Sequence, residues 1–359
     1  MELLFLGGTG FVGRHMVATA LERGHHVTLF TRNKTNTQVF PDVERLNGDR
    51  DGRLEALAGR QWDAVLDVNG YIPRIVAESS RLLINSVNRY LFVSAGNACD
   101  MPDALDDKIF IDENIPRKMI DNPASEEYWG TDYGGLKALC EQAVEEFFLD
   151  RSIILRLGVV AGPFDPTDRV TYWVDRVARG GDVLVPAKPD DPINFIDARD
   201  LAIFAILALE NNLSGIFNTA GQTLTWSEWL DACKTVSGSD ANFIWVDDVS
   251  FLSESVDLMS RPFGALPMMS GGGKRILFSS NKAVASGLEY RNCKETTKDI
   301  LSWHSERKMD ADESPESLVS RGRIALDWGS EDNGKYWMAG LTPEQEEALL
   351  QDWSKVTRG

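Results

Sequence analysis

Tyr133 and Lys137 have the residue types and the spacing that proton transfer requires. They lie four positions apart at the start of a predicted helix over residues 134–148, so both side chains face the same direction. A phenol exchanges a proton near neutral pH only if its pKa falls well below about 10, and a neighbouring ammonium lowers it by stabilising the phenolate. We therefore predict Tyr133 as the catalytic acid or base, and Lys137 as its partner and a ligand for the ribose of a nicotinamide cofactor. A packing tyrosine beside a surface lysine is the alternative.

A glycine-rich turn near the N-terminus predicts where that cofactor binds. The apolar run over residues 3–6 is typical of a buried parallel strand, and helical spacing begins at residue 11. Glycines between them let the backbone approach a pyrophosphate, and the helix N-terminus presents N–H groups to it. The expected contacts come from Gly7, Thr9, Gly10, Phe11, Val12 and Gly13. A purely structural tight turn is the alternative.

The end of the second predicted strand, residues 26–30, indicates which dinucleotide is preferred. NAD sites usually place an acid there for the ribose 2′-hydroxyl, whereas this chain has Arg32 and Lys34. These cations suit a 2′-phosphate, so we expect NADP(H), with NAD(H) as the alternative if Arg32 is merely solvated. Further cofactor contacts are expected at the ends of later strands, from Asp49, Arg50 and Ser94.

Alternating strand and helix patterns are expected to position these residues. Predicted strands cover residues 3–6, 26–30, 43–46, 64–68, 90–93 and 153–157, and predicted helices cover 11–23, 53–59, 74–86 and 134–148. The alternation indicates an α/β fold, a Rossmann-type doubly wound parallel sheet with a smaller C-terminal substrate-binding lobe. We place the dinucleotide-binding domain at 1–157, with a strand and helix return near 193–218, and the second lobe and C-terminal extension at 158–359. Residues 100–132 are expected to form an irregular insertion, and 305–334 a linker.

Composition narrows the classes of partner. The 359 residues carry a net charge of −18, which disfavours nucleic acid and anionic membrane as partners. The four cysteines are far apart and the four histidines lack ligand spacing, so we expect reduced thiols, no metal and a cytoplasmic protein.

These motifs resemble the extended short-chain dehydrogenase/reductase superfamily, the NAD(P)-dependent epimerase/dehydratase group. The resemblance covers roughly residues 1–300 and rests on the glycine turn, Asp49, Tyr133 with Lys137, and the segment from Arg156 to Gly162-Pro163. It implies a cleft between the lobes, at which substrate contacts are expected from Arg169, Tyr172, Trp173 and Arg199. The alternatives are that Tyr172 and Trp173 pack in the core and that Arg199 forms a salt bridge. By analogy with the group, a homodimer is expected.

One departure from the group concerns the catalytic hydroxyl. The group places Ser or Thr just after the fifth strand, where this chain has Ala95 or Gly96. Ser94 is expected to point into the sheet. Asn97 is the predicted replacement donor, and the irregular insertion offers two further hydroxyls, Ser125 and Thr131.

Three functions follow from these residues. The leading hypothesis is an NADP(H)-dependent reductase or dehydrogenase that acts on a small organic carbonyl, hydroxyl or imine substrate, with Tyr133 exchanging the proton. An NAD-dependent nucleotide-sugar epimerase or dehydratase is the second. A nucleotide-binding protein that has lost catalysis, similar to plastid RNA-binding proteins of this fold, is the third.

Overall fold

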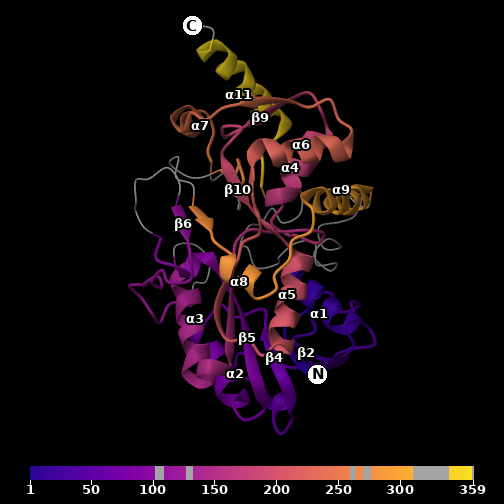
Figure 1. The fold of residues 1–359 in the computed structure, drawn as a ribbon, viewed down its shortest axis with the longest axis vertical. Helices are drawn as coiled ribbons and strands as arrows, with labels where there is room; N and C mark the ends of the chain where they lie inside the picture. Colours follow the sequence, from indigo (N-terminus) through magenta and orange to yellow (C-terminus); the bar gives the residue numbers. More distant parts are fainter. Residues whose placement is uncertain (102–108, 127–131, 259–263, 270–275, 310–338, 358–359) are drawn as a thin grey trace.

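A seven-stranded parallel sheet forms the lower half of the molecule (Figure 1). The computed structural model describes residues 1–101, 109–126, 132–258, 264–269, 276–309 and 339–357. Its sheet strands are β1 (Glu2–Leu6), β2 (His26–Thr31), β3 (Glu44–Asn47), β4 (Trp62–Asp67), β5 (Val87–Ala95), β7 (Ser152–Leu157) and β12 (Gly215–Thr219). They lie in the order β12-β7-β5-β4-β1-β2-β3, which confirms the predicted doubly wound sheet. The order reverses between β1 and β4, the place where such sheets bind ligands.

Helices cover both faces of the sheet. Helices α1 (Phe11–Glu22) and α5 (Ala198–Glu210) pack together on one face, and α2 (Pro73–Leu83) and α3 (Tyr133–Phe148) on the other. The apolar run of β1 serves both faces because successive side chains alternate. Leu3 and Phe5 belong to the core beneath α1 and α5, whereas Leu4 and Leu6 belong to the core beneath α2 and α3.

The second lobe packs around tryptophans. Helices α4 (Arg169–Ala178), α6 (Trp226–Ser237) and α9 (Cys293–Met309) contact one another, and Trp173, Trp226 and Trp229 fill the space between them. The last helix, α11 (Pro343–Val356), lies at the far end of the molecule and is tied to α4 by the Arg176–Glu346 ion pair at 2.5 Å.

Short elements complete the described chain. Paired strands are β6 (Ile109–Ile111) with β15 (Ile276–Phe278), β8 (Val160–Ala161) with β11 (Ile196–Asp197), β9 (Asp182–Val185) with β14 (Asn242–Trp245), and β10 (Pro192–Asn194) with β13 (Thr223–Thr225). The remaining helices are η1 (Glu55–Leu57), η2 (Gly96–Ala98), η3 (Leu149–Arg151), α7 (Val249–Ser255) and α8 (Asn281–Ala285).

Three local predictions need correction. The helix predicted over 53–59 is only the single turn η1, because glycines with positive φ, Gly52 and Gly59, bracket it. The strand predicted over 193–196 is split into β10 and β11, which have different partners. The first residues of the linker predicted over 305–334 belong to α9, which continues to Met309, and residues 310–334 lie outside the described residues.

Candidate active site

The glycine turn has the close backbone packing that a pyrophosphate site needs. Gly7 and Gly8 have φ of 101° and 105°, a region that L side chains rarely adopt. A Cβ on Gly13 would lie 2.8 Å from the Gly8 Cα, so glycine is required for α1 to pass this close to the turn. A Cβ on Gly10 would face open space. Gly10 is the N-cap residue of α1, and no side chain caps this helix N-terminus. An anion would therefore meet the first N–H groups of α1, those of Phe11 and Val12, which fits the pyrophosphate of a dinucleotide.

The end of β2 presents two exposed cations beside this turn. Arg32 and Lys34 are exposed, and no ion pair within the described residues holds either side chain. Asn33 between them has φ of 54°, which bends the chain sharply after the strand. Asn36 then donates from Nδ2 to the Thr9 carbonyl at 2.9 Å, which draws this loop over the glycine turn.

Two residues predicted to contact the cofactor, Arg50 and Ser94, are held by other side chains of the protein. The buried guanidinium of Arg50 donates to both carboxylate oxygens of Asp67 at 2.6 and 2.7 Å, so it supports the sheet. The Ser94 hydroxyl is buried and donates to Glu141 at 2.6 Å, as its expected orientation into the sheet implied. Asp49 is half-buried in a turn, with its carboxylate 3.5 Å from Arg53.

Tyr133 and Lys137 lie on α3 as predicted, but they do not act on each other in the expected way. Lys137 is buried and donates from Nζ to the carbonyls of Gly70 and Val93 at 2.7 and 2.8 Å. Its Nζ also lies 4.7 Å from the centre of the Tyr71 ring. Burial lowers the pKa of Lys137 to about 8. This lysine is therefore held beneath the site by two backbone carbonyls.

A cation from the opposite lobe acts on Tyr133 instead. Burial raises the pKa of Tyr133 above its ordinary value, and Tyr71, whose ring centre lies 6.4 Å away, raises it further. Arg169, from the first turn of α4, opposes both effects and so lies within electrostatic reach of the phenol. The pKa of Tyr133 is thus raised overall, which corrects the expectation that Lys137 lowers it, and Arg169 offsets only part of the rise.

One of the two candidate positions for the catalytic hydroxyl is crowded. A Cβ on Gly96 would lie 2.3 Å from the Phe278 ring, so Ser or Thr at that position would displace the ring. Asn97 is exposed. Its carbonyl lies beside Tyr133, because it packs on the next residue, Gly134, so closely that a Cβ on Gly134 would lie 2.2 Å from the Asn97 oxygen. Among the other predicted donors, Ser125 is buried, and Thr131 lies outside the described residues.

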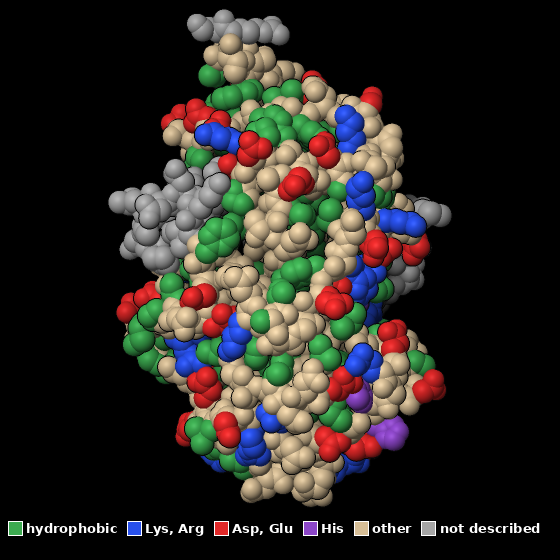
Figure 2. Space-filling view, viewed as in Figure 1, with side chains coloured by type: hydrophobic (Ala, Val, Ile, Leu, Met, Phe, Trp, Pro, Cys, Tyr) green, Lys and Arg blue, Asp and Glu red, His purple; other side chains and the backbone are tan. Residues whose placement is uncertain are grey.

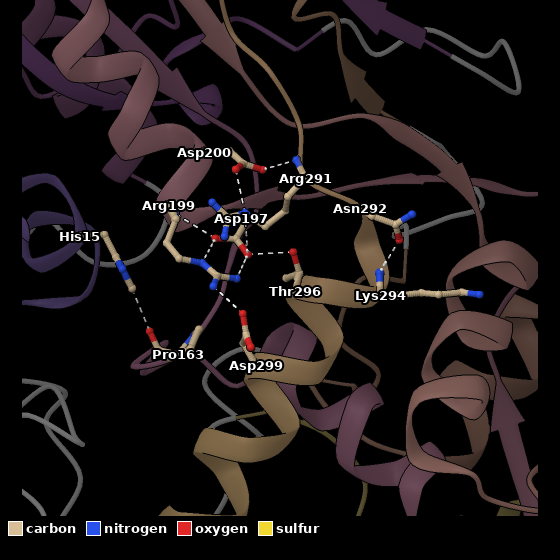
Figure 3. A network of polar contacts seen from close by, with 10 residues as sticks. All are labelled: His15, Pro163, Asp197, Arg199, Asp200, Arg291, Asn292, Lys294, Thr296 and Asp299. Carbon is tan, nitrogen blue, oxygen red and sulfur yellow. Dashed lines mark hydrogen bonds and ion pairs between the residues drawn. The ribbon is translucent and has the colours of Figure 1, made fainter. Parts of the chain in front are cut away.

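Three of the four predicted substrate contacts serve the structure instead. Tyr172 and Trp173 are buried in the second core, and Trp173 donates from Nε1 to the Pro267 carbonyl at 2.9 Å. Arg199 donates to both oxygens of Asp197 at 2.9 and 2.7 Å and also pairs with Asp299, which ties α5 to α9 (Figure 3). The fourth, Arg169, acts electrostatically on Tyr133.

Asp165 is a buried acid near this site that the sequence did not single out. It is 1% exposed, and burial raises its pKa from 3.8 to about 6. Its Oδ1 accepts hydrogen bonds from the backbone N–H and the hydroxyl of Thr167, at 2.8 and 2.7 Å. Its Oδ2 is buried without a hydrogen-bond partner among the described residues. The only signal in the sequence was the turn-forming string Asp165-Pro166-Thr167.

Replacing Asp165 with Asn is expected to stabilise the protein at neutral pH. A carboxyl whose pKa is higher in the folded state stabilises the fold most below its unfolded pKa, and this contribution is lost as the pH rises through the folded pKa. For Asp165 that window runs from 3.8 to about 6 and corresponds to about 3 kcal/mol. Urea unfolding should therefore show D165N to be more stable by about 2–3 kcal/mol at pH 8 and similar to the native protein at pH 4. The exposed Asp150→Asn serves as control, and a pH-independent difference would contradict the argument.

The described residues contain no group of three or more His, Cys, Asp and Glu side chains that could bind a metal ion. None of the described helices has the length and apolar character needed to span a membrane.

Short stretches of the chain match two curated proteins. The chloroplast stem-loop binding protein of 41 kDa b from Arabidopsis thaliana is 34% identical over 85 residues, which is 19% of this chain and 22% of that protein. A 3 beta-hydroxysteroid dehydrogenase/Delta 5-->4-isomerase from Mycobacterium tuberculosis is 44% identical over 48 residues, 13% of each chain. The match thus spans less than a quarter of either relative.

A solved structure and a family model match far more of the chain than these two proteins do. The crystal structure of the UDP-glucose 4-epimerase from Thermus thermophilus, a complex with NAD, superimposes with a TM-score of 0.56 at 20% identity. It covers 85% of this chain and 99% of that one. The model of the NAD dependent epimerase/dehydratase family matches residues 3–220, which include the glycine turn, Tyr133 and Lys137. This chain therefore belongs to the NAD dependent epimerase/dehydratase family, within the extended short-chain dehydrogenase/reductase superfamily.

Proposed function

We propose that this protein is an NADP(H)-dependent reductase or dehydrogenase that acts on a small organic carbonyl, hydroxyl or imine substrate. The observation that carries the proposal is the pair of exposed cations Arg32 and Lys34 at the end of β2, beside the glycine turn. A ribose 2′-phosphate adds negative charge where these cations lie, whereas a 2′-hydroxyl favours an acid.

In the proposed reaction, the residues of the candidate site have distinct roles. The bound cofactor supplies a hydride to the substrate carbon. Tyr133 donates its hydroxyl proton to the substrate oxygen, and its raised pKa keeps that proton in place at neutral pH. Lys137, whose Nζ is fixed by two backbone carbonyls beneath the site, is assigned the contact to the cofactor ribose. In the reverse direction Tyr133 accepts the proton of an alcohol, which becomes easier as the pH rises.

Cofactor titrations of the native protein and Arg32→Ala test the preference. Following nicotinamide fluorescence, NADPH is expected to bind at least about tenfold tighter than NADH, a difference of about 1.4 kcal/mol or more. The Ala variant should lose that difference because it removes a charge-assisted contact to the 2′-phosphate. Arg81→Ala, which removes an exposed cation from α2, is the control and should retain it. Equal affinity of the native protein for NADH and NADPH would contradict the preference.

An NAD-dependent epimerase or dehydratase acting on a nucleotide sugar is the second candidate. Family membership favours it, as does the likeness in fold to an epimerase whose crystal structure holds NAD. Such enzymes regenerate their cofactor in each cycle and hold it tightly, so stoichiometric NAD in the purified protein would favour this function. Release of a tightly bound cofactor upon denaturation, identified by mass, distinguishes NAD from NADP.

RNA binding is the candidate from another class, and it rests on the short match to the chloroplast stem-loop binding protein. Charge argues against it, since the chain carries −18 and phosphate binding needs a basic surface. On the face shown in Figure 2, basic and acidic side chains are interspersed. Filter binding of a stem-loop RNA at physiological salt is expected to show no retention, and submicromolar affinity would overturn our assignment.

A further inference from the structure

One arginine of α1 carries a charge that no acidic side chain among the described residues balances. The guanidinium of Arg14 makes no hydrogen bond and no ion pair within that part of the chain, and its Nε is buried. Burial lowers the pKa of Arg14 below its ordinary value. The buried guanidinium of Arg50, by contrast, pairs with Asp67. In a chain with a net charge of −18, a partly buried cation that has no acidic partner indicates that an anion binds there.

Arg14 lies one turn into α1, on the side of the helix at which an anion has room. Its backbone N–H donates to the carbonyl of the N-cap residue Gly10 at 2.7 Å. Long side chains on a helix point back toward its N-terminus, and residues four apart share a face. A Cβ on Gly10 would face open space. The Arg14 side chain therefore extends toward the space beside Gly10, where the first N–H groups of α1 are free to meet an anion.

The ring of Phe164 holds this guanidinium. The guanidinium carbon of Arg14 lies 4.0 Å from the ring centre, a cation–π contact. Phe164 has φ of 72°, a costly conformation for a bulky residue. Two contacts keep it there: the Pro163 carbonyl lies 3.1 Å from Nε2 of His15 on α1 (Figure 3), and the Phe164 ring lies 5.8 Å from that of Trp303 on α9. A strained ring that is 40% exposed and held against the start of α1 indicates a functional role.

We propose that Arg14 binds the pyrophosphate of the dinucleotide together with the first N–H groups of α1, and that Phe164 positions its guanidinium. The inference rests on the proposed function in that it needs a dinucleotide at the glycine turn, but it does not depend on which dinucleotide binds. A pyrophosphate supplies the negative charge that Arg14 lacks, and a guanidinium donates to two phosphate oxygens at once. The cofactor is then held from both lobes, because Phe164 packs on Trp303 of the second lobe.

Cofactor titrations separate this contact from the one assigned to Arg32. NADPH and NADH share the pyrophosphate, whereas only NADPH has the 2′-phosphate. Arg14→Gln is therefore expected to weaken the binding of both cofactors equally, by about 10–100-fold, the range for a charge-assisted hydrogen bond. Arg14→Lys, which keeps the charge, should recover part of this affinity. Arg23→Gln removes an exposed arginine at the C-terminal end of the same helix, so it is the matched control and should bind both cofactors as the native protein does.

A double-mutant cycle tests the positioning role of Phe164. Phe164→Leu removes the ring face and is expected to weaken the binding of both cofactors by about two- to fivefold, the range for an exposed cation–π contact. Phe164→Tyr, which keeps the ring, should bind them with native affinity. The double variant with Arg14→Gln should lose no more than Arg14→Gln alone, because Phe164 acts only through that guanidinium. Additive losses would contradict the positioning role.

The stability of the cofactor-free protein distinguishes a ligand-binding arginine from a structural one. Removing a cation that has no acidic partner should not destabilise the fold, so the urea midpoint of Arg14→Gln is expected to equal or exceed the native midpoint. A lower midpoint together with unchanged affinity for both cofactors would show that Arg14 serves the fold, and it would overturn the inference.

The failures of the two proposals are distinguishable. If the native protein binds NADH and NADPH equally and Arg14→Gln weakens both, the NADP(H) preference is wrong and the Arg14 contact stands. If the native protein prefers NADPH and Arg14→Gln binds both cofactors normally, the Arg14 contact is wrong and the reductase function stands. A loss confined to NADPH would place Arg14 at the 2′-phosphate and overturn the pyrophosphate assignment.

Discussion

Replacing Tyr133 with Phe is expected to lower turnover with NADPH by at least about 10²–10⁴-fold, the range for loss of a positioned general acid. NADPH affinity should stay within twofold, because Phe keeps the ring that packs near Tyr71, at 6.4 Å between centres. The measurement is the steady-state rate of nicotinamide absorbance change, combined with a fluorescence titration of cofactor binding.

The native pH dependence supports the same assignment. Burial raises the pKa of Tyr133, so its proton is retained at neutral pH, as a proton donor in carbonyl reduction requires. Oxidation of an alcohol should accelerate with rising pH, because it needs the phenolate, and Tyr133→Phe should lose this dependence. Tyr290→Phe, which removes a half-buried phenol elsewhere, is the control and should leave the rate unchanged. A Tyr133→Phe protein with native turnover would exclude Tyr133 as the acid.

Replacing Glu141 with Gln is expected to cost about 3–5 kcal/mol of unfolding free energy, the range for breaking a buried ion pair. Glu141 of α3 is fully buried and accepts hydrogen bonds from Ser94 at 2.6 Å, Arg117 at 2.8 Å and Arg156 at 2.9 and 2.8 Å. The amide of Gln keeps the shape but leaves the guanidinium of Arg156, 1% exposed, without a counter-charge. Urea unfolding measures the loss, and the exposed Glu146→Gln on the same helix is the control.

The same network makes a prediction about acid. Burial alone would raise the pKa of Glu141, but hydrogen bonds and charge from Arg156 bring it below its ordinary value of 4.5. A carboxyl with a lowered pKa stabilises the fold above its unfolded pKa and loses this contribution as the pH falls through its folded pKa. The native protein should therefore lose stability below about pH 4.5, and E141Q should show a flatter acid profile. If E141Q lowers the free energy of unfolding by less than about 1 kcal/mol at pH 7, the buried charges are already solvated and the prediction is wrong.

Local sequence patterns were sufficient to predict much of the nucleotide-binding half. The run Leu3 to Leu6, the glycines and the helical spacing after them predicted β1, the turn and α1 within a residue or two. They succeed because a parallel strand buried on both faces must be continuously apolar, and a turn that approaches α1 so closely must be glycine. The spacing of Tyr133 and Lys137 likewise placed both on one helix.

Tertiary packing decided what the polar side chains do. Arg50 and Ser94 come from positions that suit a cofactor, but their partners, Asp67 and Glu141, come from distant segments of the chain. Arg199 is held by Asp299, a hundred positions along the chain. Sequence spacing reports neighbours along one helix or strand only, whereas a buried charge takes whichever opposite charge the fold brings to it.

The sequence by itself determined the fold class, the glycine turn and the helix that carries Tyr133, because each depends on local backbone conformation and apolar periodicity. Only the tertiary structure decided that Lys137 lies against two carbonyls, that the Phe278 ring crowds Gly96, and that Arg169 lies within electrostatic reach of Tyr133. The physical reason is that Tyr133 and Arg169 lie on different lobes. Their electrostatic interaction exists only because the folded chain brings the first turns of α3 and α4 within reach of each other.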